Sequence, residues 1–229
     1  MERSNGTSVS VSVETGRSRQ QNILRVGAEV EMIIYLIRHG KTKGTEQHLY
    51  CGATNLPLSE NGRKELEENG RSRTEALKLD GFRYMTSGMR RCNETLKLLF
   101  GDVDYQENPE FREISFGIFE MHNYEELKDR ADYQKWLDED PEQTAPPEGE
   151  SGEAVRKRVL HAFDELVQEK EDTVLVSHGG VISTIMEYLF PEEEKNRYEG
   201  QPKPGEGYRL EQTAAGGFTY QKVMEEKEN

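Results

Sequence analysis

Two short apolar runs, at 32–37 and 173–177, predict two buried strands. Neither run alternates with polar positions, a pattern typical of strands that are covered on both faces of a parallel sheet. A histidine followed by a glycine comes just after each run, at His39 and at His178. Because loops converge at the carboxyl edge of such a sheet, we expect the two histidines to lie near one another.

Apolar residues at helical spacing predict helices between and after these strands. The predicted helices cover 60–68, 88–99, 123–137, 151–166 and 181–190, and further strands are predicted at 82–86, 102–106, 208–211 and 218–223. Ser59, Ser87 and Ser151 are expected to be N-caps, and Gly70 is expected to end the first helix. Residues 43–57, rich in Gly, Thr and Asn, are expected to form a loop.

The predicted helix 123–137 begins with a pattern typical of a capping box. Along it, Leu127, Ala131 and Leu137 are expected to face the core. The acidic, proline-containing stretch 138–150 that follows is expected to be a surface linker.

The composition limits the partners that can be expected. The chain has 229 residues, of which 33% are hydrophobic and 32% charged, and its formal net charge is −14. Such an acidic chain is not expected to bind nucleic acid or an anionic membrane through its overall charge. A phosphorylated substrate would therefore need a local cationic pocket. No run approaches the roughly 18 apolar residues that would span a bilayer.

The two ends of the chain are expected to lie outside the fold. Residues 1–31 lack the apolar core of a secretory signal and are expected to form a flexible leader. We expect one domain over 32–225 and a charged tail over 226–229. Cys51 and Cys92 are far apart and lack ligand spacing, which indicates neither a zinc site nor a disulfide framework. The cytoplasm is the simplest setting.

The first candidate chemistry is the motif Arg38-His39-Gly40. A guanidinium group can bind phosphate oxygens in pairs, and an imidazole is a nucleophile that is largely neutral near pH 7. Gly40 would let a bulky anion approach the backbone. A surface loop without chemistry would account for this motif alone, and a polar helix start would account for His178. Two such motifs at one predicted sheet edge favour a shared site.

Arg91 and Glu113 are two further candidates. Arg91 lies near the start of a predicted helix, where a cation is mildly disfavoured unless an anion binds there. Glu113 lies between Phe111 and Ile114, and apolar neighbours of this kind would raise a carboxyl pKa and suit a proton donor. An exposed loop glutamate is the alternative interpretation.

Taken in order, these motifs resemble the histidine phosphatase superfamily, also called the phosphoglycerate mutase-like family. The resemblance covers 32–223 and is carried by Arg38-His39-Gly40, Ser87 with Arg91 and Thr95, Glu113 before Phe116-Gly117, and His178-Gly179. It implies an α/β fold, a three-layer αβα sandwich around a mostly parallel sheet. It also implies that no metal or other cofactor is needed.

The resemblance implies a role for each catalytic candidate. His39 would be the nucleophile that becomes phosphorylated, and Arg38, Arg91 and His178 would hold the phosphoryl group. Glu113 would be the proton donor and acceptor. The physical chemistry agrees, because cations stabilise the charge of a phosphoryl group in transfer and lower the pKa of the attacking imidazole.

The family's spacing of serine, arginine and threonine selects Arg91 over its neighbour Arg90, because only Arg91 lies four residues after Ser87 and four before Thr95. The predicted substrate-binding residues are Arg38, Gly40, Thr42, Thr45, Gly52, Arg91 and Gly179.

Three positions depart from the family pattern. Gly88 stands where many members have proline, Met121 where a glycine is common, and Thr45 where an asparagine often touches the phosphate. These departures leave the substrate open.

The first hypothesis is a phosphomonoesterase that acts on a small phosphorylated metabolite, with α-ribazole 5′-phosphate or a sugar phosphate as candidates. Residues 49–54 and 112–117 resemble the phosphatase branch, which includes α-ribazole phosphatases, more than the mutase branch. A phosphoglycerate mutase is the alternative, ranked lower because no long insertion follows Glu113. A non-catalytic phosphate-binding module and a metal hydrolase are further alternatives. The partner expected is a small phosphate ester, and a homodimer is left open.

Overall fold

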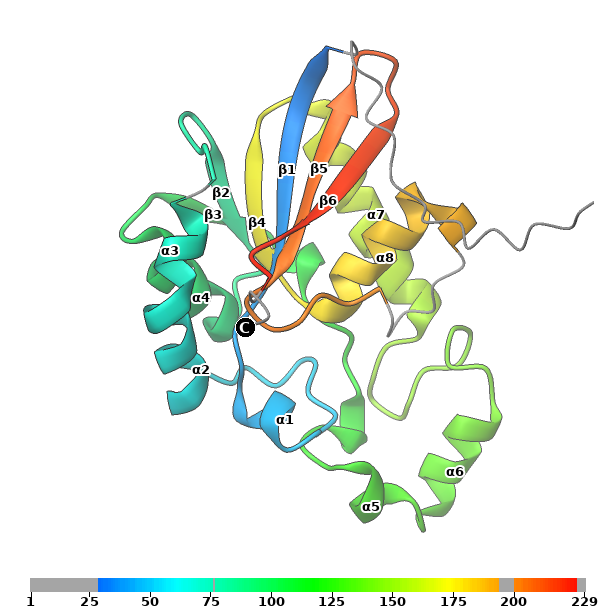
Figure 1. The fold of residues 1–229 in the computed structure, drawn as a ribbon. Coiled ribbons are helices and arrows are strands. Elements are labelled where there is room, and N and C mark those ends of the chain that lie inside the picture. The colour runs from blue at the N-terminus through cyan, green and yellow to red at the C-terminus, as the bar shows by residue number, and fades with distance from the viewer. Residues whose placement is uncertain (1–28, 76, 194–199, 226–229) are drawn as a thin grey trace, which may run out of the picture.

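The computed structural model describes residues 29–75, 77–193 and 200–225, and a single six-stranded sheet lies at its centre (Figure 1). The strands are β1 (Val30–Arg38), β2 (Arg83–Thr86), β3 (Tyr105–Glu107), β4 (Thr173–Ser177), β5 (Gly207–Thr213) and β6 (Phe218–Val223). Their order is β3-β2-β4-β1-β5-β6, and β5 runs in the opposite direction to the other five strands of this sheet. The predicted mostly parallel sheet is confirmed.

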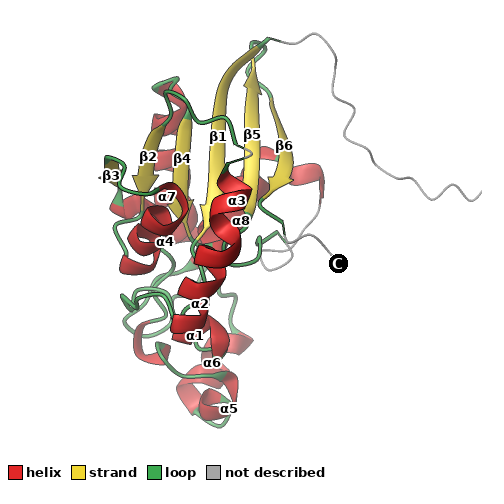
Figure 2. Cartoon of the chain, turned by 60° about the vertical axis from the view of Figure 1, so that its left-hand side comes forward, coloured by secondary structure: helices red, strands yellow, loops and turns green. Residues whose placement is uncertain are grey.

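Helices cover both faces of this sheet (Figure 2). They are α1 (Lys43–Glu46), α2 (Glu60–Glu65), α3 (Arg71–Thr74), α4 (Arg90–Phe100), α5 (Tyr124–Leu127), α6 (Ala131–Asp138), α7 (Gly152–Gln168) and α8 (Gly179–Leu189). Ile34 and Leu36 of β1 pack with α7 and α8, whereas Tyr35 and Ile37 pack with α4 on the opposite face. Because both faces of β1 are covered, its residues 32–37 form a continuous apolar run. The three-layer prediction is confirmed.

The first strand is longer than predicted. β1 begins at Val30, which pairs with Thr213 of β5, and the register shifts between Val30 and Met32. Strand structure thus includes two residues of the segment predicted as a leader, because β5 extends to Thr213, which pairs with Val30. Residues 1–28 of that segment and the tail 226–229 lie outside the described residues.

The helix predicted to end at Gly70 continues past it. α2 starts after the predicted N-cap Ser59, whose hydroxyl accepts the N–H of Gly62 at 3.0 Å. A π-helical turn, Leu66–Gly70, then leads directly into α3. The predicted helix end was wrong. Gly70 is a glycine because its helix packs closely on α4, where a Cβ at this position would lie 2.4 Å from Leu99. This glycine permits close packing between helices.

The predicted helix 123–137 is two short helices, α5 and α6, although the capping box at its start is present. Leu127 is buried as predicted, but Ala131 is exposed and Leu137 is 41% exposed. Tyr133 and Trp136 face the core instead and belong to an aromatic cluster. The break between the two helices changes which positions face inward.

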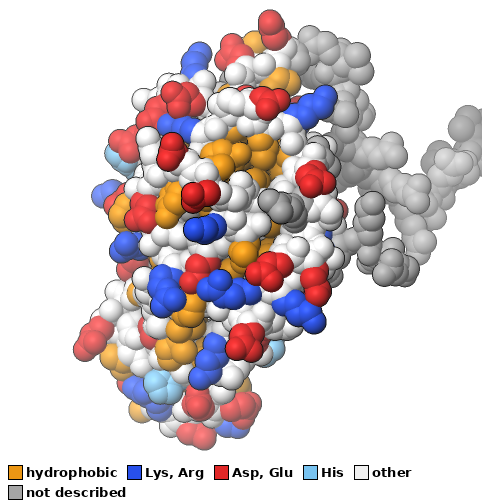
Figure 3. Space-filling model, turned by 90° about the vertical axis from the view of Figure 1, so that its left-hand side faces the viewer, with side chains coloured by type: hydrophobic (Ala, Val, Ile, Leu, Met, Phe, Trp, Pro, Cys, Tyr) orange, Lys and Arg blue, Asp and Glu red, His pale blue; other side chains and the backbone are white. Residues whose placement is uncertain are grey.

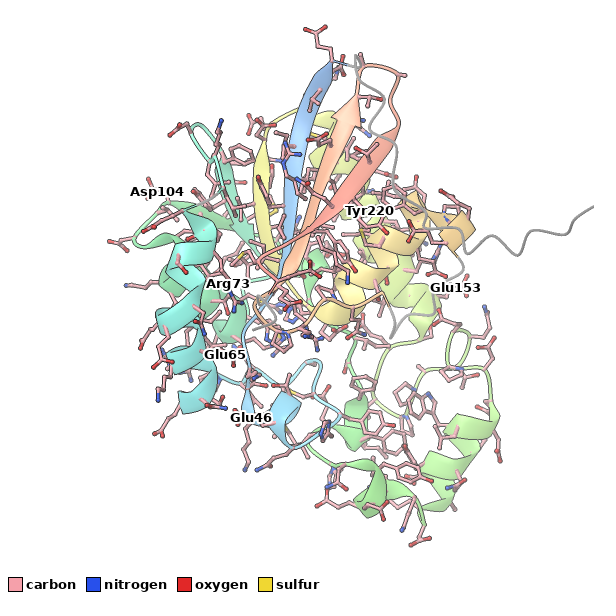
Figure 4. The ribbon with its side chains drawn as sticks, viewed as in Figure 1. Glu46, Glu65, Arg73, Asp104, Glu153 and Tyr220 are labelled. Carbon is pink, nitrogen blue, oxygen red and sulfur yellow. The ribbon has the colours of Figure 1, made fainter. Side chains whose placement is uncertain are left out.

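A one-turn helix, α1, interrupts the segment predicted as a loop, and polar contacts hold this region to α2. Glu46 of α1 accepts a hydrogen bond from the Ser59 hydroxyl at 2.8 Å, and Lys41 pairs with Glu65 of α2 at 2.8 Å. Figure 4 labels both carboxylates, which lie beyond the lower end of the sheet in that view. The chain that follows β1 is therefore anchored close to the carboxyl edge of the sheet.

Acidic and basic side chains are interspersed around apolar patches on the face that carries α2 and α3 (Figure 3). Of the helices in the described ranges, none is both long and apolar enough to cross a membrane.

Candidate active site

His39 directly follows β1 at the carboxyl edge of the sheet. Its backbone N–H donates to the carbonyl of Ser177 at the end of β4, at 3.0 Å, so two parallel strands fix its position. The side chain is 6% exposed, and Nδ1 lies 2.7 Å from the carbonyl oxygen of Gly40. Since a carbonyl only accepts, Nδ1 carries the proton and Nε2 keeps its lone pair. This is the tautomer that a nitrogen nucleophile requires.

His178 follows β4 and faces His39, with ring centroids 5.2 Å apart. Arg91 Nε donates to Nδ1 of His178 at 3.2 Å, so the proton of His178 is on Nε2, which donates to the Ser87 hydroxyl at 2.8 Å. The N-cap role predicted for Ser87 is wrong. Met89 is the N-cap of α4, with no side-chain cap, because the Ser87 hydroxyl bonds to His178.

The guanidinium of Arg91 is fixed from three directions. The side chain is 1% exposed. Nη2 donates to the carbonyl of Gly52 at 2.8 Å and Nη1 to the carbonyl of Thr54 at 2.9 Å, in addition to the bond from Nε to His178. A guanidinium has five N–H groups, so two remain for an anion once these described bonds are made.

Gly40 joins the end of β1 to α4. Its N–H donates to the hydroxyl of Thr95 at 3.0 Å, and that hydroxyl donates to the carbonyl of Arg91 at 2.6 Å. A Cβ at Gly40 would lie 2.6 Å from Leu66 Cδ1. The glycine and the threonine therefore set how closely His39 and Arg91 can approach.

Arg38, the last residue of β1, lies beside Gly179. Its Nη1 donates to the carbonyl of Pro202 at 2.9 Å, whereas its Nε is buried without a hydrogen-bond partner in the described part of the chain. A Cβ at Gly179 would lie 3.0 Å from Arg38 Cζ, so the glycine makes room for the guanidinium. A buried donor without an acceptor costs free energy, and an anion oxygen would relieve that cost.

Burial and positive charge keep both histidines neutral. Burial, and then the charges of Arg91 and Arg38, hold the pKa of His39 well below its ordinary range. Burial and the charge of Arg91 do the same to the pKa of His178. Burial also lowers the pKa of Arg38, against the opposing charge of Glu113. Arginine nevertheless stays charged at neutral pH, so the site combines fixed cations with a neutral nucleophile.

Glu113 lies against the first turn of α8. Its Oε2 accepts the N–H of Gly180 at 2.9 Å, and its Oε1 accepts the N–H of Ile114 at 3.0 Å. A Cβ at Gly180 would lie 2.4 Å from Glu113 Oε1, so this glycine makes room for the carboxylate. The surroundings of Glu113 are mixed. Phe111 is fully buried in the core, and the carboxylate lines a cavity with both polar residues, such as Arg112 and Arg158, and apolar residues, such as Met89 and Pro109.

This cavity has a volume of about 320 Å³. It is lined by Ala53, Asn55, Met89, Pro109, Arg112, Glu113, Ser115, Glu150 and Arg158. Arg158 of α7 donates to three backbone carbonyls in segment 110–113 and pairs with Glu150 at 3.0 Å. Glu150 in turn accepts the N–H of Ser115 at 3.0 Å. These contacts of Arg158 and Glu150 hold the irregular segment that carries Glu113 in place.

Thr42 and Thr45 bond to one another. The Thr45 N–H donates to the Thr42 hydroxyl at 3.2 Å, and the Thr42 N–H donates to the Thr45 hydroxyl at 2.8 Å. The Thr45 hydroxyl also donates to the Thr42 carbonyl at 2.9 Å, so its proton is already used in capping α1. Of the predicted substrate-binding residues, Gly52 contributes the carbonyl that holds Arg91.

The arrangement matches a known family. The model of the histidine phosphatase superfamily (branch 1) matches residues 34–223 of this chain. The chain belongs to the histidine phosphatase superfamily.

Relatives within the superfamily have more than one activity in their names. The chain is 30% identical over 164 residues to the adenosylcobalamin/alpha-ribazole phosphatase of Escherichia coli (strain K12), covering 69% of this chain and 79% of the relative. It is 25% identical over 175 residues to a 2,3-bisphosphoglycerate-dependent phosphoglycerate mutase of Parvibaculum lavamentivorans, with the same two coverages, 69% and 79%.

A solved structure shows the same fold. The crystal structure of the alpha-ribazole phosphatase from Shigella flexneri matches with a TM-score of 0.74 and 25% identity, over 86% of this chain and all of that one, 100%. The predicted family, fold class and phosphatase class of enzyme are confirmed.

The side chains of this histidine phosphatase site suit an anion better than a metal. Within 29–75, 77–193 and 200–225, no three His, Cys, Asp or Glu side chains group as metal ligands. Both ring nitrogens of His178 and Nδ1 of His39 have protein partners. Among the ring nitrogens of these two histidines, only His39 Nε2 has no hydrogen-bond partner in the described part of the chain, and the charges of Arg91 and Arg38 act on its ring.

Three residues that support the histidine phosphatase site were not predicted from the sequence: Gly180, Arg158 and Glu120. Gly180 had a signal, since it doubles the glycine that follows His178. Arg158 and Glu120 had none, because they bond to backbone groups of loops far away in the sequence.

Proposed function

We propose that this protein hydrolyses a small phosphate monoester in two steps, through a phosphoryl group carried on Nε2 of His39. The observation that carries the proposal is a buried, neutral imidazole whose Nε2 keeps its lone pair and on which the charges of Arg91 and Arg38 act. Within the described residues, the buried Nε of Arg38 has no hydrogen-bond partner. A phosphoryl group in transfer spreads negative charge over its equatorial oxygens, which fixed cations stabilise strongly where water is excluded. Phosphate binding alone would need the cations but no nucleophile.

In the first step the lone pair of His39 Nε2 attacks phosphorus. The N–P bond forms as the bond between phosphorus and the ester oxygen breaks, and Arg38 and Arg91 hold the equatorial oxygens. Glu113, in its protonated form, gives its proton to the departing oxygen. The bond from Nδ1 to the Gly40 carbonyl supports the positive charge that the ring acquires.

In the second step water attacks the phosphorus of phosphohistidine. Glu113, now a carboxylate, takes a proton from the water as the new O–P bond forms. The N–P bond breaks, inorganic phosphate leaves and His39 is again neutral. Each acid or base step of this kind typically contributes about 10² to 10⁴ in rate.

The cavity beside Glu113 is where we place the leaving group. Its wall offers hydrogen-bonding groups from Asn55, Arg112 and Ser115, together with smaller apolar surfaces from Met89 and Pro109. Such a lining suits a hydroxylated leaving group with some apolar surface. α-Ribazole 5′-phosphate and sugar phosphates have this character, and the first of them agrees with the names of the relatives.

A phosphoglycerate mutase is the second candidate, favoured by the mutases among the relatives. The two activities use the same nucleophile and differ in whether the phosphoryl group is passed to water or returned to the substrate. Adding 3-phosphoglycerate separates them, because a mutase forms 2-phosphoglycerate whereas a phosphatase releases inorganic phosphate.

The direct test is a screen with p-nitrophenyl phosphate, α-ribazole 5′-phosphate, sugar phosphates and phosphoglycerates, combined with acid-quench detection of phosphohistidine. We expect phosphate release without added metal, unchanged by a chelator, and a labelled His39. If the protein binds inorganic phosphate but shows neither turnover nor labelling, the alternative of a non-catalytic binding module is correct. Loss of activity with a chelator would point to the metal hydrolase.

We further propose that the enzyme works in the cytoplasm. Cys51 and Cys92 are free thiols, which a reducing compartment maintains. A measurement of the molecular mass in solution would show whether two copies associate. One chain supplies all the residues used in the steps above.

A further inference from the structure

The carboxylate of Glu120 is the centre of a hydrogen-bond cluster outside the proposed catalytic residues. Its Oε1 accepts the N–H groups of Ala53 at 2.9 Å and Phe116 at 3.0 Å. Its Oε2 accepts both the N–H of Thr54 at 3.1 Å and the Thr54 hydroxyl at 2.6 Å. The N–H of Gly52 lies 3.0 and 3.1 Å from the two oxygens. Three consecutive backbone N–H groups therefore converge on one anion.

The same short loop holds Arg91 on its other side. Gly52 and Thr54 give their N–H groups to Glu120, and their carbonyls accept from Nη2 and Nη1 of Arg91. Glu120 and Arg91 are thus linked through the peptide groups of loop 52–54. Together with the bond from Nε to His178, these two carbonyls are the described hydrogen-bond partners that orient the planar guanidinium of Arg91.

We propose that Glu120 is a positioning residue that aims the guanidinium of Arg91 at the phosphoryl group by fixing loop 52–54. The inference rests on the proposed function, in which Arg91 holds the equatorial oxygens. A carboxylate is required because only an anion with acceptors on both oxygens satisfies all these donors, and charged acceptors form the stronger hydrogen bonds. A glutamine would turn an NH₂ group toward backbone N–H groups.

Other contacts hold the loop in place without Glu120. The Met121 N–H donates to the Tyr50 carbonyl at 2.7 Å, and the Tyr50 N–H donates to the His122 carbonyl at 2.8 Å. On the inner side, a Cβ at Gly52 would lie 1.5 Å from the carbonyl oxygen of Ile114, so the loop already touches that segment. Loss of the carboxylate should therefore loosen the direction of the two carbonyls that hold Arg91 more than it unfolds the domain.

The test is the variant Glu120→Gln, assayed with p-nitrophenyl phosphate, with a phenyl phosphate of poorer leaving group, and with inorganic phosphate as inhibitor. We expect kcat/KM to fall about 10- to 100-fold, the loss typical of a partner that orients a site residue. The fall should be equal for both esters because Arg91 acts on the phosphoryl group, and the inhibition constant of phosphate should rise. Glu120→Asp, which keeps the charge, should recover part of the loss.

The decisive measurement is a double-mutant cycle with Arg91→Ala. If Glu120 works through Arg91, Glu120→Gln should cost less than about twofold in the Arg91→Ala background. A loss there as large as in the wild type would overturn the proposal, since it would mean that Glu120 acts on the fold or on another group. Unchanged kinetics and phosphate inhibition in Glu120→Gln would overturn it as well.

Two further variants keep the test decisive. Glu126→Gln removes a carboxylate that also accepts a backbone N–H, in the capping box of α5 away from loop 52–54, and should change neither kinetics nor phosphate inhibition. If Glu120→Gln does not fold, Thr54→Val removes only the hydroxyl bond to Glu120 and goes through the same cycle, with a smaller expected loss.

The outcomes also separate this inference from the proposed function. If the wild type hydrolyses p-nitrophenyl phosphate and Glu120→Gln has the same kinetics, only the role proposed for Glu120 is wrong. A wild-type protein without turnover still reports on Glu120 through its affinity for inorganic phosphate, measured by calorimetry. If the wild type neither hydrolyses esters nor binds phosphate, both proposals are wrong.

Discussion

The two sides of the site are built differently. The phosphate side, Arg38, His39, Arg91 and His178, comes from the ends of β1 and β4 and from α4, and Arg91 and His178 are 1% and 0% exposed. The leaving-group side, Glu113 and the cavity beside it, comes from an irregular segment held by side chains of other elements. In the proposed mechanism, the charges that hold the phosphoryl group are set in the rigid core, whereas proton transfer would take place where different leaving groups enter.

The energetics of the two sides differ in the same way. Burying a guanidinium is costly unless its donors are bonded, and Arg91 has three such bonds in place before any ligand arrives. Glu113 needs room for a leaving group and has two backbone N–H partners. We therefore expect the phosphate side to act on every substrate and the leaving-group side to discriminate among substrates.

The largest effect should come from removing the nucleophile. His39→Ala should lower kcat by about 10⁵-fold or more, since both ring nitrogens of His178 have partners and His39 Nε2 is the histidine nitrogen of this site that has none among the described residues. The variant should fold with a melting temperature near that of the wild type and should yield no phosphoprotein after acid quench. Retained turnover or labelling would show that the nucleophile is a different group.

A second test separates Arg91 from its neighbour. Arg91→Ala should lower kcat/KM by about 10³-fold for good and poor leaving groups alike, because it removes donors to the phosphoryl oxygens. Arg90→Ala is the matched control. Its side chain is 59% exposed and pairs with Glu94 at 3.4 Å, so the expected loss is less than about twofold. The reverse ranking in steady-state assays would contradict the assigned spacing.

The phosphate side was predictable because its residues follow regular elements. His39 and His178 were found from apolar runs that end at one sheet edge, a consequence of parallel pairing between β1 and β4. Arg91 was found from its spacing to Ser87 and Thr95, and the structure explains that spacing, since the Thr95 hydroxyl bonds to Gly40 and Ser87 bonds to His178.

The leaving-group side and its supports were harder to predict. Glu113 was proposed from the sequence, but the contacts that hold its segment were not, because they depend on Arg158 and Glu150 reaching it from α7 and the loop before α7. Errors within helices have the same origin. Gly70 resembles a helix end in sequence, and only its contact with Leu99 in three dimensions shows why a glycine stands there.

A third test addresses the discrimination expected of the leaving-group side. Glu113→Gln keeps the shape of the side chain but has no proton to give, so it should slow phenyl phosphates with poor leaving groups by about 10²-fold. The p-nitrophenolate group of p-nitrophenyl phosphate leaves without a proton, so hydrolysis of this ester should be slowed much less. Plots of log kcat/KM against leaving-group pKa should therefore be steeper for the variant. If the plots for the wild type and the variant were parallel, Glu113 would not act as the acid, and the two sides would not differ in function as we expect.

The smallest effect concerns stability in acid and belongs to the phosphate side alone. Burial and the arginines hold the pKa values of His39 and His178 well below the 6.5 of an ordinary histidine. The unfolded chain therefore binds protons below about pH 6.5 that the folded chain does not, and the free energy of unfolding should fall as the pH drops from that value. Each such proton changes the slope by about 1.4 kcal/mol per pH unit. Urea titrations at pH 6 and 5 give the free energy of unfolding at each pH. The dependence of this free energy on pH should be smaller by the contribution of one proton in His39→Ala and unchanged in Arg90→Ala. Identical slopes in all three proteins would mean that His39 takes up a proton in the folded state, and a neutral nucleophile at acid pH would then have to be abandoned.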